Sequence, residues 1–478
     1  MNVLQSYLAA TKTVGTEFEK KPLLKIKGKM PDGLKGTLFR NGNGNHEHMG
    51  SPYDHVFDGD GMINKFEIGR NGIMYSNAFV KTREFKEEVK AGKMLYRSFG
   101  TNIPGGWKNN IGKLSFKNAA NTNIIQFGGK MLALWEGGWP HEINPETLET
   151  IGRYNYQGVL QNNFSFIDKK VQPELPFSAH PKFLPDHNKL FNFGTSPGGV
   201  PRLILYEVND AGKARITQVV KLKRLSFTHD FVVTNSGKKI FFLTPVSFNI
   251  WKTLLGAISP VESLDFKENK PTTILIVDQD KKHNLQSDFC FIFHFLNTYE
   301  DGDGNIVVDA LKMDHFPDAD SNKEVLKGND KAILHAKPVR YLLNLKTKEV
   351  TQETLADIGM ELPAVHPDLR GKAYQYAYGI AATKAKTHSL LEEIVKLDVK
   401  NKSYQSIEFP GSIPGEPVFV PKPHANAEDE GWLLFTRYHA KTNQTIFCIA
   451  EAKDLSILYE AALPHNVPIG FHGTWLPR

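Results

Sequence analysis

The sequence predicts an all-β fold, and its hairpins indicate a β-propeller. Paired β-rich runs recur along the chain across short turns, as at Gly128-Gly129, at residues 209–212 and at residues 235–237. Long stretches with helical periodicity are scarce, and no shift of composition marks a boundary within the 478 residues. The strands are too many for a simple sandwich, so four-stranded blades around an axis fit best, although no sequence repeat is visible. We therefore expect one domain over residues 1–478.

Two longer, irregular segments interrupt the hairpins, at about residues 82–118 and 247–270. The second contains the run SFNIWKTLLGAISPVESLDF, in which apolar residues lie close to helical spacing. Those residues are Phe248, Ile250, Trp251, Leu254, Leu255 and Ile258. One interpretation is a helix packed on the body of the protein. The other is an interfacial helix that dips into a bilayer, to which Trp251 beside Lys252 is suited.

The composition excludes several classes of protein. The formal net charge is +6, but the basic residues are scattered, so we expect no nucleic-acid partner and at most a weak attraction to anionic lipid. Only two cysteines occur, Cys290 and Cys448, which argues against a disulfide framework and fits a reducing compartment. No secretory signal and no run of 18 apolar residues is found. We expect a cytoplasmic monomer.

Four histidines lie in apolar or aromatic runs rather than in polar loops. They are His180 in PFSAHPKF, His229 in LSFTHDFVVT, His294 in CFIFHFLNTYED and His472 in IGFHGTWLPR. Burying an imidazole in such a setting costs free energy unless a partner is present. Any one of them is explained well by a hydrogen-bonded core histidine. Four in similar settings favour convergence on one metal, although their long and uneven spacing does not demonstrate it.

These four contexts resemble the four-histidine iron site of the carotenoid cleavage oxygenase family. Other landmarks resemble the family in the same order, from about Pro31 to Leu476: GTLFRNGNGN, HVFDGDGMINKFEI, NTNIIQFGGKMLALWEGGWPHEINPETLET, ELPAVHPDLRGKAYQYAYG and GEPVFVP. The resemblance implies a seven-bladed β-propeller capped by a helical and loop dome, with Fe(II) on the axis. By resemblance the iron ligands are His180, His229, His294 and His472, and the last strand, which carries His472, completes the final blade.

The resemblance also assigns supporting roles to other residues. It places Glu136 behind His229, Glu361 behind His294 and Glu416 behind His472, and it gives His180 no carboxylate. A carboxylate in that place would fix the tautomer and orientation of a ligating imidazole. Taken alone, each glutamate could equally be a solvated side chain. By the same resemblance, Thr122 limits access to an open coordination position, and Phe57 and Trp135 form part of the substrate tunnel, with ordinary core packing as the alternative.

The residue before Glu136 bears on the substrate. Stilbene-cleaving relatives resemble one another in having a lysine there, where it meets a phenolate, whereas this chain has Trp135. We therefore expect an Fe(II) dioxygenase that uses O2 to cleave a conjugated double bond of a carotenoid or apocarotenoid into two carbonyl products. The alternatives are a stilbenoid-cleaving dioxygenase and a non-catalytic propeller that binds a polyene. Because polyenes dissolve in bilayers, we expect peripheral docking on a membrane, with Phe248, Trp251, Leu254, Leu255 and Ile258 as the patch.

Overall fold

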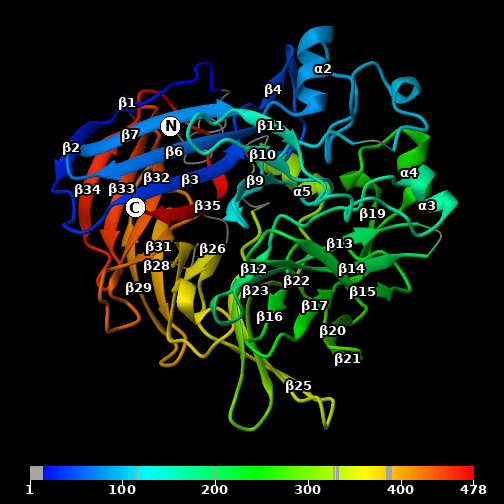
Figure 1. The fold of residues 1–478 in the computed structure, drawn as a ribbon. Coiled ribbons are helices and arrows are strands. Elements are labelled where there is room, and N and C mark those ends of the chain that lie inside the picture. The colour runs from blue at the N-terminus through cyan, green and yellow to red at the C-terminus, as the bar shows by residue number, and fades with distance from the viewer. Residues whose placement is uncertain (1–13, 115, 199, 327–328, 330–332, 384–389) are drawn as a thin grey trace.

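Seven antiparallel sheets of four or more strands surround a common axis (Figure 1). The computed structural model describes residues 14–478 except 115, 199, 327–328, 330–332 and 384–389. Within that part of the chain the sheets are the blades of a propeller, which confirms the predicted fold class and blade number.

The blades follow one another along the chain. The first contains β1 (Lys21–Pro22), β3 (Gly36–Asn43), β6 (Gly61–Gly69), β7 (Gly72–Phe79) and β35 (Gly470–Pro477). The second contains β8 (Asn123–Phe127), β9 (Lys130–Leu134), β10 (His141–Ile143) and β11 (Thr150–Arg153). The third contains β12 (Lys182–Leu184), β13 (Lys189–Ser196), β14 (Arg202–Asn209) and β15 (Ala214–Lys221). The fourth contains β16 (Val232–Val233), β17 (Lys239–Leu243), β20 (Thr272–Asp278) and β21 (Lys281–Ser287).

Three further blades complete the ring. The fifth contains β22 (Phe291–Glu300), β23 (Ile306–Met313), β24 (Lys337–Leu343) and β25 (Val350–Thr354). The sixth contains β26 (Gly359–Val365), β27 (Tyr376–Ala382), β28 (Glu393–Asp398) and β29 (Ser403–Glu408). The seventh contains β2 (Leu24–Gly28), β30 (Ser412–Pro414), β31 (Val418–Pro421), β32 (Gly431–His439), β33 (Gln444–Glu451) and β34 (Ile457–Ala462).

The two ends of the chain interlock the first and last blades. Strand β35 pairs with β3, with Arg40 opposite Gly473, and β2 pairs with β34 as the outer strand of the seventh blade. The chain passes between these two blades near both of its ends, which closes the ring. The prediction that the last strand completes the final blade is wrong in one respect: β35 completes the first blade, because it pairs with β3.

Burial falls from the axis outward. Strand β22, which begins the fifth blade, is buried over most of its length, whereas the outer strands β25 and β29 are largely exposed. Strands covered on both faces read as nearly continuous apolar runs, and strands with one wet face alternate. This is why the histidine contexts look like core sequence.

The two predicted insertions contain short helices and contact each other. The first holds α2 (Arg83–Ala91) and the 3-10 turn Trp107–Asn109; the second holds α4 (Ile250–Leu255), the 3-10 turn Val261–Ser263 and the small β18–β19 pair, Val246–Phe248 with Leu264–Phe266. The buried guanidinium of Arg97 donates to the carbonyls of Thr253 at 2.7 Å and Ile258 at 2.8 Å, which ties the insertions together. Figure 1 shows α2 and α4 on the same, upper side of the propeller.

The remaining short elements lie in loops: residues 166–171 join the second blade to the third, and the others connect strands within one blade. They are α3 (Phe166–Val171), α5 (Ala319–Leu326), the 3-10 turns Pro185–His187 and Pro367–Leu369, and the β4–β5 pair, Glu47–His48 with Ser51–Pro52. Among the residues that the structure describes, no helix has both the length and the apolar character needed to cross a membrane.

Candidate metal centre

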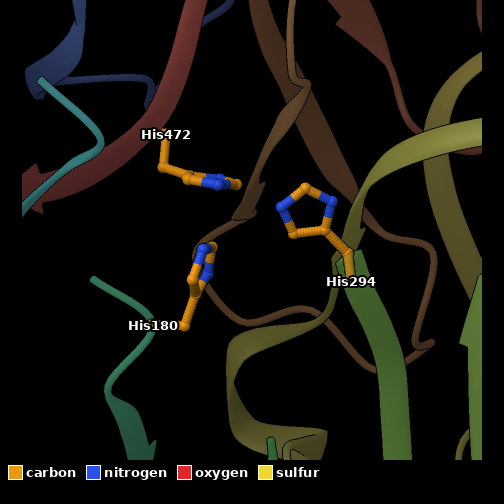
Figure 2. Close-up of side chains that lie close together, drawn as sticks. All are labelled: His180, His294 and His472. Carbon is orange, nitrogen blue, oxygen red and sulfur yellow. The ribbon is translucent and has the colours of Figure 1, made fainter. Parts of the chain in front are cut away.

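The four histidines singled out in the sequence come from four different blades. His180 and His229 lie two and three residues before β12 and β16, while His294 lies in β22 and His472 in β35. Each of these strands is the one at the axial end of its sheet, so the propeller turns residues far apart in sequence toward one point. Figure 2 shows the rings of His180, His294 and His472 directed toward one another.

The ring nitrogens of the cluster are close enough to share one ion. One nitrogen each of His180, His294 and His472 lies within 4.8 Å of the other two. His229 joins through His180, with 2.8 Å between their Nε2 atoms and 4.3 Å between their ring centroids. The ring centroid of His229 is also 5.3 Å from that of His294.

Three carboxylates hold three of the imidazoles from behind. Glu136 Oε2 is 2.6 Å from Nδ1 of His229, Glu361 Oε2 is 2.6 Å from Nδ1 of His294, and Glu416 Oε1 is 2.7 Å from Nδ1 of His472. Each bond engages Nδ1, which leaves Nε2 to face the axis. His180 has no hydrogen bond to a carboxylate among the described residues, in line with the pairing that the sequence resemblance implied. Glu361 lies in β26, Glu416 just before β31 and Glu136 just after β9.

The electrostatics favour neutral imidazoles at two of the positions. Burial is the main cause that lowers the pKa of His180 and of His294 well below 6.5, and the neighbouring histidines add to the effect. Burial alone would also lower the pKa of His229, but the charge and hydrogen bond of Glu136 outweigh it, so that pKa is raised. Burial raises the pKa of Glu361 to about 7. A neutral imidazole has the free lone pair that a metal ligand needs.

The arrangement fits a metal ion. A metal–nitrogen distance of about 2.1 Å separates neighbouring ligand nitrogens by about 3 Å and opposite ones by about 4 Å, close to the separations in the cluster. Nε2 of His294 is buried and makes no hydrogen bond, although such an atom normally has a partner. Its other ring nitrogen is already bonded to Glu361. A metal at the centre of the cluster would satisfy this nitrogen.

The buried Arg40 holds the Glu416 support in place. Its Nη1 donates to the Glu416 carbonyl at 2.6 Å and lies 4.0 Å from a Glu416 carboxylate oxygen, while Nη2 donates to the Phe471 carbonyl at 3.4 Å. The second carboxylate oxygen of Glu416 accepts from the Gly473 N–H at 2.9 Å. Glu416 is therefore fixed through both its backbone and its side chain. In the sequence, nothing singled out Arg40 beyond its place in the motif GTLFRNGNGN.

Comparison with known proteins agrees with this geometry. A sequence model of the family described as retinal pigment epithelial membrane protein matches residues 11–477. The chain belongs to this family, the carotenoid oxygenases. It is 33% identical to the apocarotenoid-15,15'-oxygenase of Synechocystis sp., over 94% of this chain and 92% of the relative. It is 26% identical to isoeugenol monooxygenase of Pseudomonas nitroreducens, over 95% of this chain and 94% of the relative. A crystal structure of cobalt-substituted Synechocystis ACO superposes with a TM-score of 0.92 at 31% identity, covering 99% of both chains.

Aromatic side chains gather on one side of the histidines in this carotenoid oxygenase. The Phe293 ring stands edge-on to His229 with centroids 5.1 Å apart, and Phe57 packs against Phe293 at 6.2 Å and against Phe471 at 5.7 Å. Phe57 is half-buried, so part of its surface is free to meet a ligand. The sequence singled out Phe57 but missed Phe293, which directly precedes His294 and was part of the same aromatic run.

Trp135 and Thr122 lie at the same centre. The Trp135 ring covers Gly137 so closely that a Cβ there would come within 2.6 Å of it, so Gly137 sets the position of the ring. Trp135 is half-buried and directly precedes Glu136. The Thr122 carbonyl accepts a hydrogen bond from the His472 N–H at 3.2 Å, which places Thr122 beside that histidine.

A polar channel occupies the other side of the histidines. It has a volume of about 240 Å³, includes His180, His294 and His472 in its wall, and runs along residues that follow the histidines and glutamates in sequence. All seven axial strands contribute: Ile125 of β8, Phe183 of β12, Val233 of β16, Asn297 of β22, Val365 of β26, Val418 of β31 and Thr474 of β35. The sequence did not predict this channel, although Lys182 and Asp230 stand one or two residues beyond histidines that it did single out.

Proposed function

We propose that His180, His229, His294 and His472 hold Fe(II), with Glu136, Glu361 and Glu416 fixing three of the rings. The observation that carries this is the convergence of four imidazoles, three of them each bonded through Nδ1 to its own carboxylate. Four neutral ligands leave the full charge on the ion and leave coordination positions open. Iron in such a site supplies O2 activation, which redox-inert zinc does not.

We propose that the reaction is the oxidative cleavage of a conjugated double bond in a carotenoid or apocarotenoid, giving two carbonyl products. The name of the Synechocystis relative and the similarity over nearly the whole chain support this. The protein's own part is to orient a polyene beside the centre. Phe57, Phe293 and Trp135 offer apolar surface for that purpose, and Thr122 would limit access to an open position on the ion.

Replacing His294 by alanine tests the metal assignment. We expect the metal content, measured by mass spectrometry, to fall together with the cleavage activity, because the substitution removes the ring and with it the buried Nε2 atom. The exposed His315, which pairs with Glu268 at the surface, offers a matched control, and His315→Ala should keep both. Unchanged iron content and activity in His294→Ala would disprove the four-histidine site. If the variant lost activity but kept its metal, a non-catalytic role for the metal would be favoured instead.

A phenylpropanoid or stilbenoid substrate is the second candidate, because isoeugenol monooxygenase is also a relative. Trp135 argues against it, since an indole offers no charge to a phenolate. Chromatography of iron-loaded protein incubated with apocarotenals, resveratrol and isoeugenol separates the two. Cleavage of the phenolic compounds alone would overturn the carotenoid assignment. A protein that binds a polyene without metal or product would be the non-catalytic propeller.

We further propose that the protein, as a monomer, docks on a membrane through exposed side chains around α4. Trp251 is 79% exposed and Leu255 is 64% exposed, whereas Phe248, Leu254 and Ile258 are partly buried. Phe248 packs toward the body, against Phe99 and Phe227. The Gly112 N–H donates to the Leu254 carbonyl at 2.9 Å, which brings two more exposed apolar residues, Trp107 and Ile111, beside α4.

Co-sedimentation with liposomes tests this docking surface. Trp251→Ser with Leu255→Ser should weaken binding about tenfold or more, because each burial in the interface contributes about 1.5–3 kcal/mol. Phe166→Ser on α3 removes a side chain of similar exposure, 73%, from another segment and serves as the control. Equal binding by the double variant and the unaltered protein would exclude α4 as the docking element.

A further inference from the structure

The polar channel carries two cations and two carboxylates, and both carboxylates are already engaged. Asp230 pairs with Lys182 at 2.7 Å and also accepts from the Phe231 and Phe295 N–H groups at 2.8 and 3.3 Å. Glu416 accepts from His472 and Gly473, with Arg40 behind it. These contacts leave Arg370 as the cation of the channel wall without a paired carboxylate.

Arg370 is a permanent charge that lacks a close partner. Its side chain lines the channel and makes no hydrogen bond or ion pair with any residue that the structure describes. Its side chain is exposed to solvent. Burial by the surrounding protein nevertheless lowers its pKa, an effect opposed by the charges of Glu416 and Asp368. A guanidinium stays protonated in proteins, so Arg370 cannot lose its charge to avoid the free-energy cost of losing part of its water shell.

Hydrogen bonds from β22 fix the backbone of the loop that contains Arg370. The Asn297 amide, on β22, donates to the carbonyls of Leu369 at 2.8 Å and Lys372 at 3.0 Å, and its oxygen accepts from the Gly371 N–H at 2.9 Å. Gly371 has φ +78°, and a Cβ there would come within 2.9 Å of the Leu184 side chain. An axial strand therefore clamps the backbone on both sides of Arg370, which fixes where its side chain begins.

We propose that Arg370 binds a small monovalent oxyanion, of the size of formate or bicarbonate, inside the axial channel. The planar fork of a guanidinium matches the two oxygens of such an ion in a way that a lysine cannot. A volume of about 240 Å³ holds the ion together with several water molecules. Because Asp230 neutralises Lys182, the bound ion balances Arg370. This inference concerns the side of the histidines that faces away from Phe57 and Phe293, and it does not depend on the reaction proposed above.

Calorimetric titration of the metal-loaded, full-length protein with sodium formate tests the site, at constant ionic strength set with a bulky sulfonate. We expect Arg370→Gln to weaken formate binding at least tenfold and Arg370→Lys, which keeps the charge without the fork, to fall between. Lys372→Gln is the matched control: it removes the same charge two residues away, where Nζ pairs with Asp186 at 2.6 Å, and binding should change less than twofold.

Three results would overturn the proposal. The first is formate binding that is equal in Arg370→Gln and the unaltered protein. The second is formate binding that is abolished by removal of the metal but not by replacement of the arginine. The third comes from crystals of the unaltered protein grown in bromide, where we expect an anomalous peak in contact with Arg370. Peaks at surface lysines alone would show that the channel holds no anion, and this measurement does not require any variant to fold.

Discussion

The two sides of the four-histidine cluster differ in charge, although the same strands build both. Phe293 and Phe471, each directly before a histidine of the cluster, and Phe57, which packs on both, supply aromatic rings on one side. The wall of the channel on the other side also holds phenylalanines, but it carries the charges of Lys182, Asp230 and Arg370. A polyene has no groups to pair with charges, and pressing it against them would strip their water at a cost. We therefore expect a polyene to approach from the aromatic side and small polar species to enter the channel.

Removing residues 469–478 should have the largest effect on metal content and stability, because these residues contribute to both sides of the cluster. The deletion takes away His472 and all of β35, leaving the fully buried β3 with an unpaired edge. We expect loss of metal and of cooperative unfolding, measured by metal analysis and thermal melting followed by circular dichroism. His472→Ala in the full chain separates the two losses, since it keeps β35. A truncated protein that melts like the full chain would contradict the closure described above.

We expect the buried carboxyl of Asp58, on the aromatic side, to make the stability of the folded protein depend on pH. It is buried next to Phe57, accepts from the Gly100 N–H at 3.1 Å and the Thr101 hydroxyl at 2.6 Å, and so holds the first insertion to the propeller. Burial raises its pKa to about 7 despite these bonds. The folded state thus keeps a proton that the unfolded chain releases near pH 4, so stability should fall as pH rises from about 4 to 7.

The contribution of Asp58 over that window amounts to as much as about 4 kcal/mol. Asp58→Asn cannot titrate and can still accept both hydrogen bonds, so its denaturant-melting curves should show a flatter decline across the window. The exposed Asp303 offers a control, since Asp303→Asn should leave the slope as it is. An Asp58→Asn slope identical to that of the unaltered protein would mean that the carboxyl is ionised throughout.

Glu416 touches both sides, because it orients His472 and lines the channel. Glu416→Gln keeps the size of the side chain but replaces a charged acceptor with a neutral one. Metal affinity should fall about 10–100-fold, the usual effect of losing such a partner. Competition with a chelator measures it, and Glu353→Gln at the surface, where Glu353 pairs with Lys402, controls for the change in charge. An unchanged affinity would leave Glu416 with a purely structural part.

The sequence predicted the propeller and the residues of the cluster better than what surrounds them. The apolar contexts of the four histidines reflect strands covered on both faces, and that signal is local. The channel is not local: Asn297 clamps a loop more than 70 residues further along, and the charge of Glu416 acts on Arg370 only because neighbouring blades share an axis. Likewise Trp107 and Ile111 join α4 through a contact between two insertions, so no window of sequence around Trp251 contains them.

The smallest expected effect comes from a pair of matched substitutions on β22, which test the contrast between the aromatic side and the channel side. Phe293 faces His229 and the aromatic side, while Phe295, two residues on, lies in the channel wall and the blade core. Phe293→Leu removes one aromatic contact, worth about 0.5–1.5 kcal/mol, so KM for an apocarotenal should rise roughly two- to tenfold. Phe295→Leu should lower the melting temperature and leave KM within twofold. If Phe295→Leu raised KM as much as Phe293→Leu, the polyene would reach the channel, and the division of the axis into an aromatic and a polar side would not hold for the substrate.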